Sequence, residues 1–142
     1  MFRCRKGVNG YSMVFSASFG NVDRACRHID EFLRCHGFAP SFVVELGARE
    51  IMNNAITHGS GQDSRRHVRF RISLRKNQLY LKSSDDGKGY TPSLHPQGDR
   101  TVLRESGHGL AILHAYFDSV SFNEAGNEIT LALKDFDASG AK

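Results

Sequence analysis

The chain has 142 residues, of which 39% are hydrophobic and 24% charged, with a formal net charge of +4 at pH 7. This length and composition predict one domain, residues 1–142, with a single hydrophobic core. No apolar run approaches the roughly 20 residues of a membrane helix, and the first residues lack a secretory signal, so we expect a cytoplasmic protein without membrane contact. Three cysteines are too few for a disulfide framework. The mild positive charge permits an acidic or phosphorylated partner.

Hydrophobic periodicity predicts one strand and two helices in the first part of the chain. Residues 10–17 have the composition of a strand. Residues 21–36 carry apolar side chains at helical spacing, with Asn21 as the expected N-cap and Gly37 as the stop signal. A second helix is expected over residues 42–57.

In the middle of the chain the period changes to two, which predicts two half-buried strands over residues 68–75 and 79–85. The outward positions of the first of these strands include Arg69, Arg71 and Arg75. We expect these arginines to point away from the helices. The second strand ends in Asp85 on its inward, otherwise apolar face.

The rest of the chain contains a long connection and three short elements. Residues 86–107 are interrupted by glycines and prolines, which predicts a long mobile loop of the kind that is usually functional. A third helix over 109–117 is expected next, followed by strands over 120–122 and 129–133. We expect the tail from residue 135 onward to be frayed.

This order of elements predicts an α+β protein with a core over about residues 10–134. Amphipathic helices must bury their apolar faces, and here one sheet is the partner layer available to them. We therefore expect a two-layer α/β sandwich, in which one mixed, mainly antiparallel sheet carries the helices on one face.

Three polar residues share one stripe of the second expected helix, within EIMNNAITHG (residues 50–59). Glu50, Asn54 and His58 stand at positions i, i+4 and i+8. A solvated helix face would explain this stripe equally well. The functional alternative is a magnesium–phosphate centre, because Mg²⁺ prefers hard oxygen ligands and a nearby glutamate can act as a base.

A second group of residues, DDGKGY (85–90), follows the strand that ends in Asp85. An inward carboxylate must find hydrogen-bond donors, because burying it alone costs several kcal/mol. An adenine amino group would be such a donor, and Gly87 and Gly89 would let the backbone approach a flat base. For this hexapeptide alone, an ordinary Asp-Gly turn is the simpler interpretation.

A third group, SGHGLAIL (106–113), places glycines before the third expected helix. Backbone amides at a helix N-terminus can cradle phosphate, although a lone Gly-x-Gly is a common pattern. The Rossmann pattern is absent because Ile112 occupies its third glycine position. The order of the three groups, with a long loop before the last one, is what an ATP site requires.

At these three motifs the sequence resembles the GHKL ATPase superfamily of gyrase, heat-shock chaperone, histidine kinase and mismatch-repair ATPases. EIMNNAITHG resembles the asparagine box, DDGKG the first glycine box and SGHGL the second. The resemblance covers about residues 10–134 and is closest to the small anti-sigma-factor serine/threonine kinases. It implies the Bergerat-type ATP-binding fold, with residues 90–106 as a mobile ATP lid.

The resemblance also implies roles for individual residues. Asn54 would ligate the Mg²⁺ that accompanies ATP, Glu50 would be the general base toward a serine hydroxyl, and Asp85 would accept from the adenine amino group. The remaining nucleotide-binding positions would be Gly87, Gly89, Gly107, His108, Gly109 and Leu110. These kinases commonly have an arginine immediately before the Ser-Gly of the second glycine box. Glu105 stands there, so Arg104, or Arg100 in the lid, is the candidate that reaches the terminal phosphate.

The implied function is a serine/threonine protein kinase that phosphorylates a small STAS-type anti-anti-sigma protein, binds a sigma factor and regulates transcription by partner switching. The departure at Glu105 keeps open an alternative, a nucleotide-binding regulatory module of the same fold without kinase activity. A homodimer through the exposed sheet is a further possibility. We expect no direct nucleic-acid binding, because a solvated face explains the arginine-rich strand more simply and no aromatic residues are interleaved outward on it.

Overall fold

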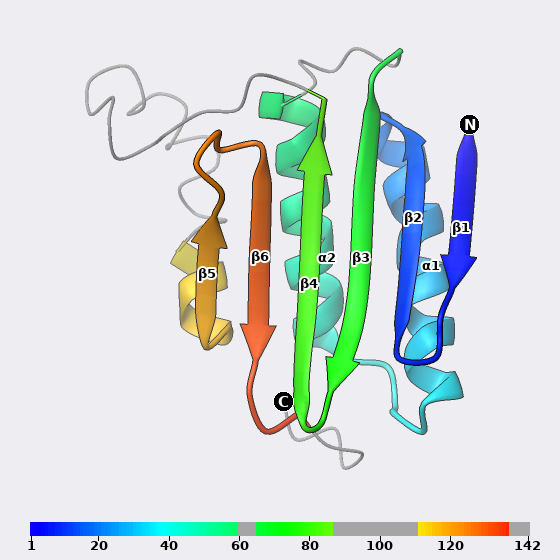
Figure 1. Cartoon of the computed structure of the whole chain (residues 1–142), viewed down its shortest axis with the longest axis vertical. Helices are drawn as coiled ribbons and strands as arrows, with labels where there is room; N and C mark the ends of the chain where they lie inside the picture. Colours follow the sequence, from blue (N-terminus) through cyan, green and yellow to red (C-terminus); the bar gives the residue numbers. More distant parts are fainter. Residues whose placement is uncertain (60–64, 87–110, 137–142) are drawn as a thin grey trace.

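A computed structural model describes residues 1–59, 65–86 and 111–136. These residues form one six-stranded sheet in the order β1-β2-β3-β4-β6-β5, with the helices packed on one face (Figure 1). The strands are β1 (Phe2–Lys6), β2 (Gly10–Ser16), β3 (His67–Arg75), β4 (Gln78–Asp85), β5 (Ser119–Phe122) and β6 (Glu128–Leu133). The helices are α1 (Phe19–Cys35) and α2 (Phe42–Asn54), and residues 111–116 are also helical. The α+β sandwich is confirmed. Each of the five pairings among the described strands is antiparallel, so the expected mixed character of the sheet was wrong.

The edge strand β1 was not predicted. It pairs with β2 along its whole length, and it contacts the core mainly through Phe2, whose ring stacks on Phe15 at a centroid distance of 5.3 Å. The other four residues of β1 are exposed. An edge strand of this kind lacks the apolar alternation from which strands are recognised, so its sequence shows charge and not periodicity.

Helix α1 begins earlier than expected, and its N-cap is Ser18 instead of Asn21. Ser18 has an extended backbone, and its hydroxyl accepts a hydrogen bond from the backbone N–H of Asn21 at 3.3 Å. The side-chain amide of Asn21 donates instead to the carbonyl of Ser16 at 2.9 Å. Serine and asparagine are both good N-cap residues, so the sequence offered two candidate starts three residues apart.

The second expected helix is present but changes type near its end. Ser41 caps α2 by accepting from the backbone N–H of Val44 at 3.1 Å. The α-helix ends at Asn54, and a π-helical turn continues over Ala55–Gly59. A uniform α-helix over 42–57 was therefore wrong for its last turn. Single π-helical turns are rare and occur frequently at functional sites.

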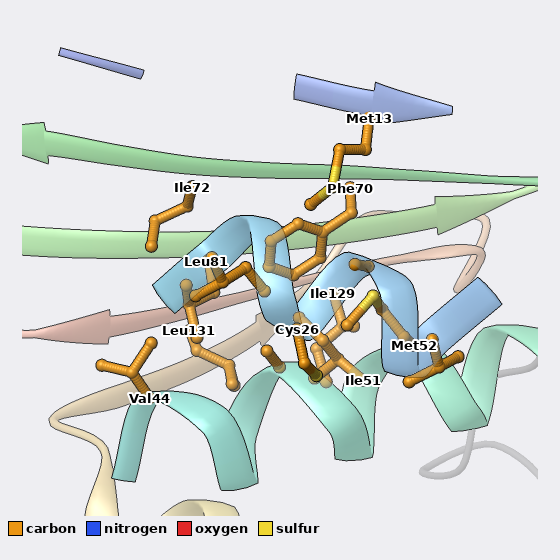
Figure 2. Close-up of a cluster of buried hydrophobic side chains, with 14 of the residues drawn as sticks. Met13, Cys26, Val44, Ile51, Met52, Phe70, Ile72, Leu81, Ile129 and Leu131 are labelled. Atoms are coloured by element: carbon orange, nitrogen blue, oxygen red, sulfur yellow. The ribbon is translucent and has the colours of Figure 1, made fainter. Parts of the chain in front are cut away.

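The hydrophobic core lies between the sheet and the helices (Figure 2). Helix residues such as Cys26, Val44 and Ile51 face Phe70 and Leu81 from the sheet (Figure 2). All five side chains are buried. Burial raises the pKa of the Cys26 thiol to about 11, because the thiolate is poorly solvated there.

Two residues near the end of the described chain are also packed into this core. A Cβ atom at Gly47 of α2 would lie 2.3 Å from the ring of Phe117, so Phe117 packs directly against the α2 backbone. Phe136 is buried against Phe38, with ring centroids 4.8 Å apart, and its backbone N–H donates to the carbonyl of Asn77. The prediction of a tail frayed from residue 135 was therefore wrong at Phe136.

The face of the sheet opposite α1 and α2 is not covered by any helix among the described residues (Figure 1). Arg69, Arg71 and Arg75 are exposed on this face, as the alternation of β3 predicted. Within the described part of the chain, no helix is both long and apolar enough to cross a membrane.

Candidate functional site

A hollow lies between the C-terminal part of α2, the end of β4 and the connection between β5 and β6. Its cavity volume is about 20 Å³, within about 330 Å³ of empty space that includes the solvent at its mouth. Six of the residues that line it are Ile51, Asn54, Ser83, Asp85, Phe122 and Asn127. Asn54 and Asp85, 31 positions apart in the sequence, thus border one hollow, the spatial relation that an ATP site in this sequence requires.

Asp85 reaches the hollow because β4 alternates between the two faces of the sheet. It follows Leu79, Leu81 and Ser83 on the inward face, and its residue is only 9% exposed. Its backbone N–H donates to the carbonyl of Asn127 at 3.1 Å, which ties the end of β4 to the turn before β6. The backbone therefore holds the Asp85 carboxyl at the border of the hollow.

Two polar atoms at this hollow lack a hydrogen-bond partner. Among the described residues, the only buried side-chain nitrogen or oxygen atoms in this condition are Nδ2 of Asn54 and Oγ of Ser83. Ser83 is 1% exposed. A buried, unsatisfied polar group destabilises a protein by about 1–3 kcal/mol. A polar ligand in the hollow would supply partners for both groups.

Ser83 was missed in the sequence analysis. It stands two positions before Asp85, so the period of two that placed the aspartate inward also placed the serine inward. The sequence therefore contained a sign of Ser83's role, namely a hydroxyl side chain at an inward position of β4 where the preceding inward side chains are apolar. Asn127 lies in the connection just before β6, and no local pattern brings it to the end of β4.

Glu50 lies on α2 one turn before Asn54 and is half-buried. It does not line the hollow itself. Burial raises the pKa of the Glu50 carboxyl above its usual range, because the charged form is partly removed from water. A carboxyl whose pKa is shifted toward neutrality is better suited to accept a proton than an ordinary exposed one.

The predicted stripe of Glu50, Asn54 and His58 is regular only as far as Asn54. His58 lies in the π-helical turn, where hydrogen bonds span five residues instead of four. The i+8 position of an α-helix therefore does not describe where His58 stands. The side chain of His58 is outside the described part of the structure.

The remaining predicted site residues lie outside the described residues. They comprise Arg104, the two glycine-box groups Gly87, Gly89, Gly107, His108, Gly109 and Leu110, and the expected lid over 90–106. Their roles stay predictions. The described helical residues 111–116 follow the second glycine box directly, and Leu113 of this helix is buried in the core.

The fold is that of an α+β domain with a polar hollow between one helix and the end of its sheet. The family model of the histidine kinase-like ATPase domain matches residues 15–133, which is most of the chain. The chain therefore belongs to the histidine kinase-like ATPases of the GHKL type. Domains of this family bind ATP, usually with Mg²⁺. No curated protein matches the sequence closely enough to identify a relative.

The side chains at the hollow fit a magnesium nucleotide. The side-chain amide nitrogen of Asn54 lacks a hydrogen-bond partner. Rotating this amide by half a turn would put its oxygen where the nitrogen now lies, and an amide oxygen is a ligand that Mg²⁺ accepts. Asp85 and Ser83 offer an acceptor and a hydroxyl at the other side. Such a pair can hydrogen-bond the edge of a nucleobase.

Proposed function

We propose that this chain is an ATP-dependent serine/threonine protein kinase of the anti-sigma-factor type. Its substrate is a small STAS-type anti-anti-sigma protein, and it regulates transcription by exchanging that partner for a sigma factor. The observation that supports the proposal most is the shared hollow of Asn54 and Asp85, whose lining also contains the unpartnered Ser83 hydroxyl.

In this proposal Asp85 accepts from the adenine amino group, and Ser83 lies beside it on the same face of β4. The amide oxygen of Asn54 would hold the Mg²⁺, which would neutralise charge on the phosphates. Glu50, one helical turn earlier, faces the incoming protein substrate. The four residues come from α2 and β4, two elements that the core holds together.

Glu50 takes the proton in the transfer step. The serine oxygen of the partner forms a bond to the terminal phosphorus of ATP while the bond from that phosphorus to its bridging oxygen breaks. The hydroxyl proton passes to the Glu50 carboxylate, and ADP leaves. Phosphorylation adds up to two negative charges to the partner, which lowers its affinity for the kinase. The kinase is then available to bind the sigma factor.

The direct test is phosphate transfer. The full chain would be incubated with Mg²⁺ and radiolabelled ATP, together with STAS-type proteins from the same source, and label on the partner would be measured. Glu50→Ala should abolish transfer while ATP binding, measured by calorimetry, persists. The matched control is Asn53→Ala, three residues further along the same helix, which should keep both. Absence of transfer to every STAS partner would reject the kinase proposal.

A second candidate function is a regulatory module that binds ATP without transferring phosphate. The observation in its favour is Glu105 at the position where these kinases commonly carry an arginine. Missing positive charge near the terminal phosphate lowers the rate of transfer more than the affinity for nucleotide. Substituting Glu105→Arg separates the two candidates, because a gain of transfer over an inactive parent chain would identify the module.

A further inference from the structure

A second, larger hollow lies on the helix-free face of the sheet. It has a volume of about 540 Å³, in the size range of small-molecule sites. Its lining includes Arg71, Arg75, Tyr80, Lys82, Thr130 and Gly10. The sheet separates it from the Asn54–Asp85 hollow, because Lys82 and Ser83 are consecutive residues of β4 on opposite faces.

Arg71 is held in one position on this face. Its Nη1 donates to the hydroxyl of Ser12 on β2 at 2.7 Å. Its Nη2 lies next to Gly10, and a Cβ atom added at Gly10 would lie only 2.7 Å from this nitrogen. The guanidinium therefore lies close against the backbone of β2, in space that glycine leaves open. A guanidinium fixed in this way loses less conformational entropy when it binds an anion.

The positive charges at this hollow are not compensated within the described part of the chain. Lys82 is the direct cross-strand neighbour of Arg71, which places their Cβ atoms about 5 Å apart. Like charges in this arrangement destabilise a sheet. No described carboxylate forms an ion pair with Arg71, Arg75 or Lys82.

Arg69, two residues before Arg71 on the same strand, provides an internal comparison. Its Nη1 donates to Asp86 Oδ1 at 2.8 Å, and this hydrogen bond lowers the pKa of the Asp86 carboxyl. One outward arginine of β3 therefore has a carboxylate partner, whereas Arg71 is hydrogen-bonded only to the neutral hydroxyl of Ser12 among the described residues. Arg71, Arg75 and Lys82, the cations that border the hollow, have no such carboxylate partner among the described residues.

We propose that this hollow binds a phosphorylated small molecule through a diphosphate group, at a site separate from the ATP pocket. A fixed guanidinium beside an ammonium suits the oxygens of one phosphate. Arg75, four residues along β3 and roughly 13 Å from Arg71 by Cα position, can approach a second linked phosphate. We do not expect a second copy of this chain to cover the hollow with the same face, because its cations would then lie opposite Arg71, Arg75 and Lys82 and repel them.

Titration of the full chain with sodium pyrophosphate at fixed ionic strength tests the site. We expect binding by calorimetry, with amide shifts at Arg71, Tyr80 and Lys82 in NMR spectra. Shifts centred on Asn54 and Ser83 would overturn the proposal, because they would place pyrophosphate in the ATP pocket. Succinate should bind at least roughly tenfold more weakly, because each of its carboxylates carries less charge and fewer acceptor oxygens than a phosphate group of pyrophosphate.

Matched variants separate a built site from general charge. Arg71→Gln and Lys82→Gln should each weaken pyrophosphate roughly tenfold, because each removes a charged hydrogen bond. Arg69→Gln removes the same charge from the same strand and should change the affinity less than about twofold, since its partner is Asp86. Equal losses in Arg69→Gln and Arg71→Gln would reject the site.

Gly10→Ala tests the geometry at constant charge. The added methyl group displaces the flexible end of Arg71 and not the backbone, so we expect a folded protein with weakened pyrophosphate binding. Unchanged affinity would show that the position of the guanidinium is irrelevant and would overturn the proposal. A single-stranded oligonucleotide that binds more tightly than pyrophosphate, with equal losses in Arg69→Gln and Arg71→Gln, would identify a nucleic-acid surface instead. The site does not depend on the proposed kinase activity, because pyrophosphate can bind whether or not ATP does.

Discussion

The two faces of the sheet receive the same residue types from β4 and use them differently. Ser83 and Asp85 point inward to the Asn54 hollow, whereas Ser84 and the residue that follows β4, Asp86, lie on the helix-free face. The inward serine is buried without a partner, and the inward aspartate ends a row of apolar side chains. The outward aspartate neutralises Arg69 in solvent. Serine and aspartate thus have different roles on the two faces, because the helices exclude water from one face and leave the other in solvent.

The largest effect should come from adding one methyl group to the helix-covered side. Alanine normally stabilises the interior of a helix relative to glycine. At Gly47, however, the new Cβ would lie 2.3 Å and 2.5 Å from the Phe117 ring and 3.0 Å from Leu131. We expect Gly47→Ala to lower the free energy of unfolding by about 3 kcal/mol, as overpacked cores do.

Urea denaturation of both proteins measures this effect. Gly10→Ala is the matched change on the helix-free side, and we expect it to alter stability by less than about 0.5 kcal/mol. If Gly47→Ala proved stabilising, Phe117 would not pack against α2 as described.

The next effect is on nucleotide affinity. Asp85→Asn replaces one acceptor oxygen with a donor and should weaken ATP binding by about 2 kcal/mol. Asp86→Asn, the neighbouring substitution on the other face, should leave ATP affinity unchanged. Calorimetric titration with Mg²⁺-ATP measures both. Equal losses in the two variants would remove the distinction between the faces of β4.

A smaller effect should distinguish the two serines. Ser83→Ala removes an unpartnered buried hydroxyl, so the nucleotide-free protein should become more stable by about 1 kcal/mol. Ser84→Ala, on the helix-free face, should have almost no effect. Thermal unfolding with and without ATP measures the difference, and the gain from Ser83→Ala should shrink when ATP is present. A loss of stability without nucleotide would mean that the hydroxyl already has a partner.

The smallest effect should be a dependence of stability on pH. Because burial raises the pKa of Glu50 in the folded state, the folded protein favours the protonated form. Below the ordinary glutamate pKa of about 4.3, Glu50 is protonated in both states and does not reduce the free energy of unfolding. As the pH rises through the folded-state pKa, the buried carboxyl becomes charged and the free energy of unfolding falls. Glu50→Gln should therefore become progressively more stable than the natural chain over that range.

Melting temperatures from pH 4 to pH 8 measure this trend, and Glu124→Gln in the exposed β5–β6 turn should not reproduce it. If the advantage of Glu50→Gln were greatest at the acidic end, the sign of the pKa shift would be wrong.

Local pattern alone determined most of the elements of this protein. The period of two placed Arg69, Arg71 and Asp85 on their correct faces, and helical spacing located α1 and α2 to within a few residues. These features depend on which side chains are exposed to solvent, and the alternation of polar and apolar residues along the chain predicts that exposure. The Ser18 cap and the π-helical turn were not recognised, because each depends on a choice between local alternatives of similar energy. The strand β1 was not recognised because it lacks apolar alternation.

Only the tertiary structure determined which residues from distant parts of the sequence lie next to each other. The sequence nominated Asn54 and Asp85 separately, and only the packing of α2 on β4 brings them to one hollow with Ser83 and Asn127. The cross-strand register likewise placed Lys82 beside Arg71, and Asp86 reached Arg69 at the end of β4. Contacts between distant segments follow from the burial of the whole core, and no short stretch of sequence contains that information.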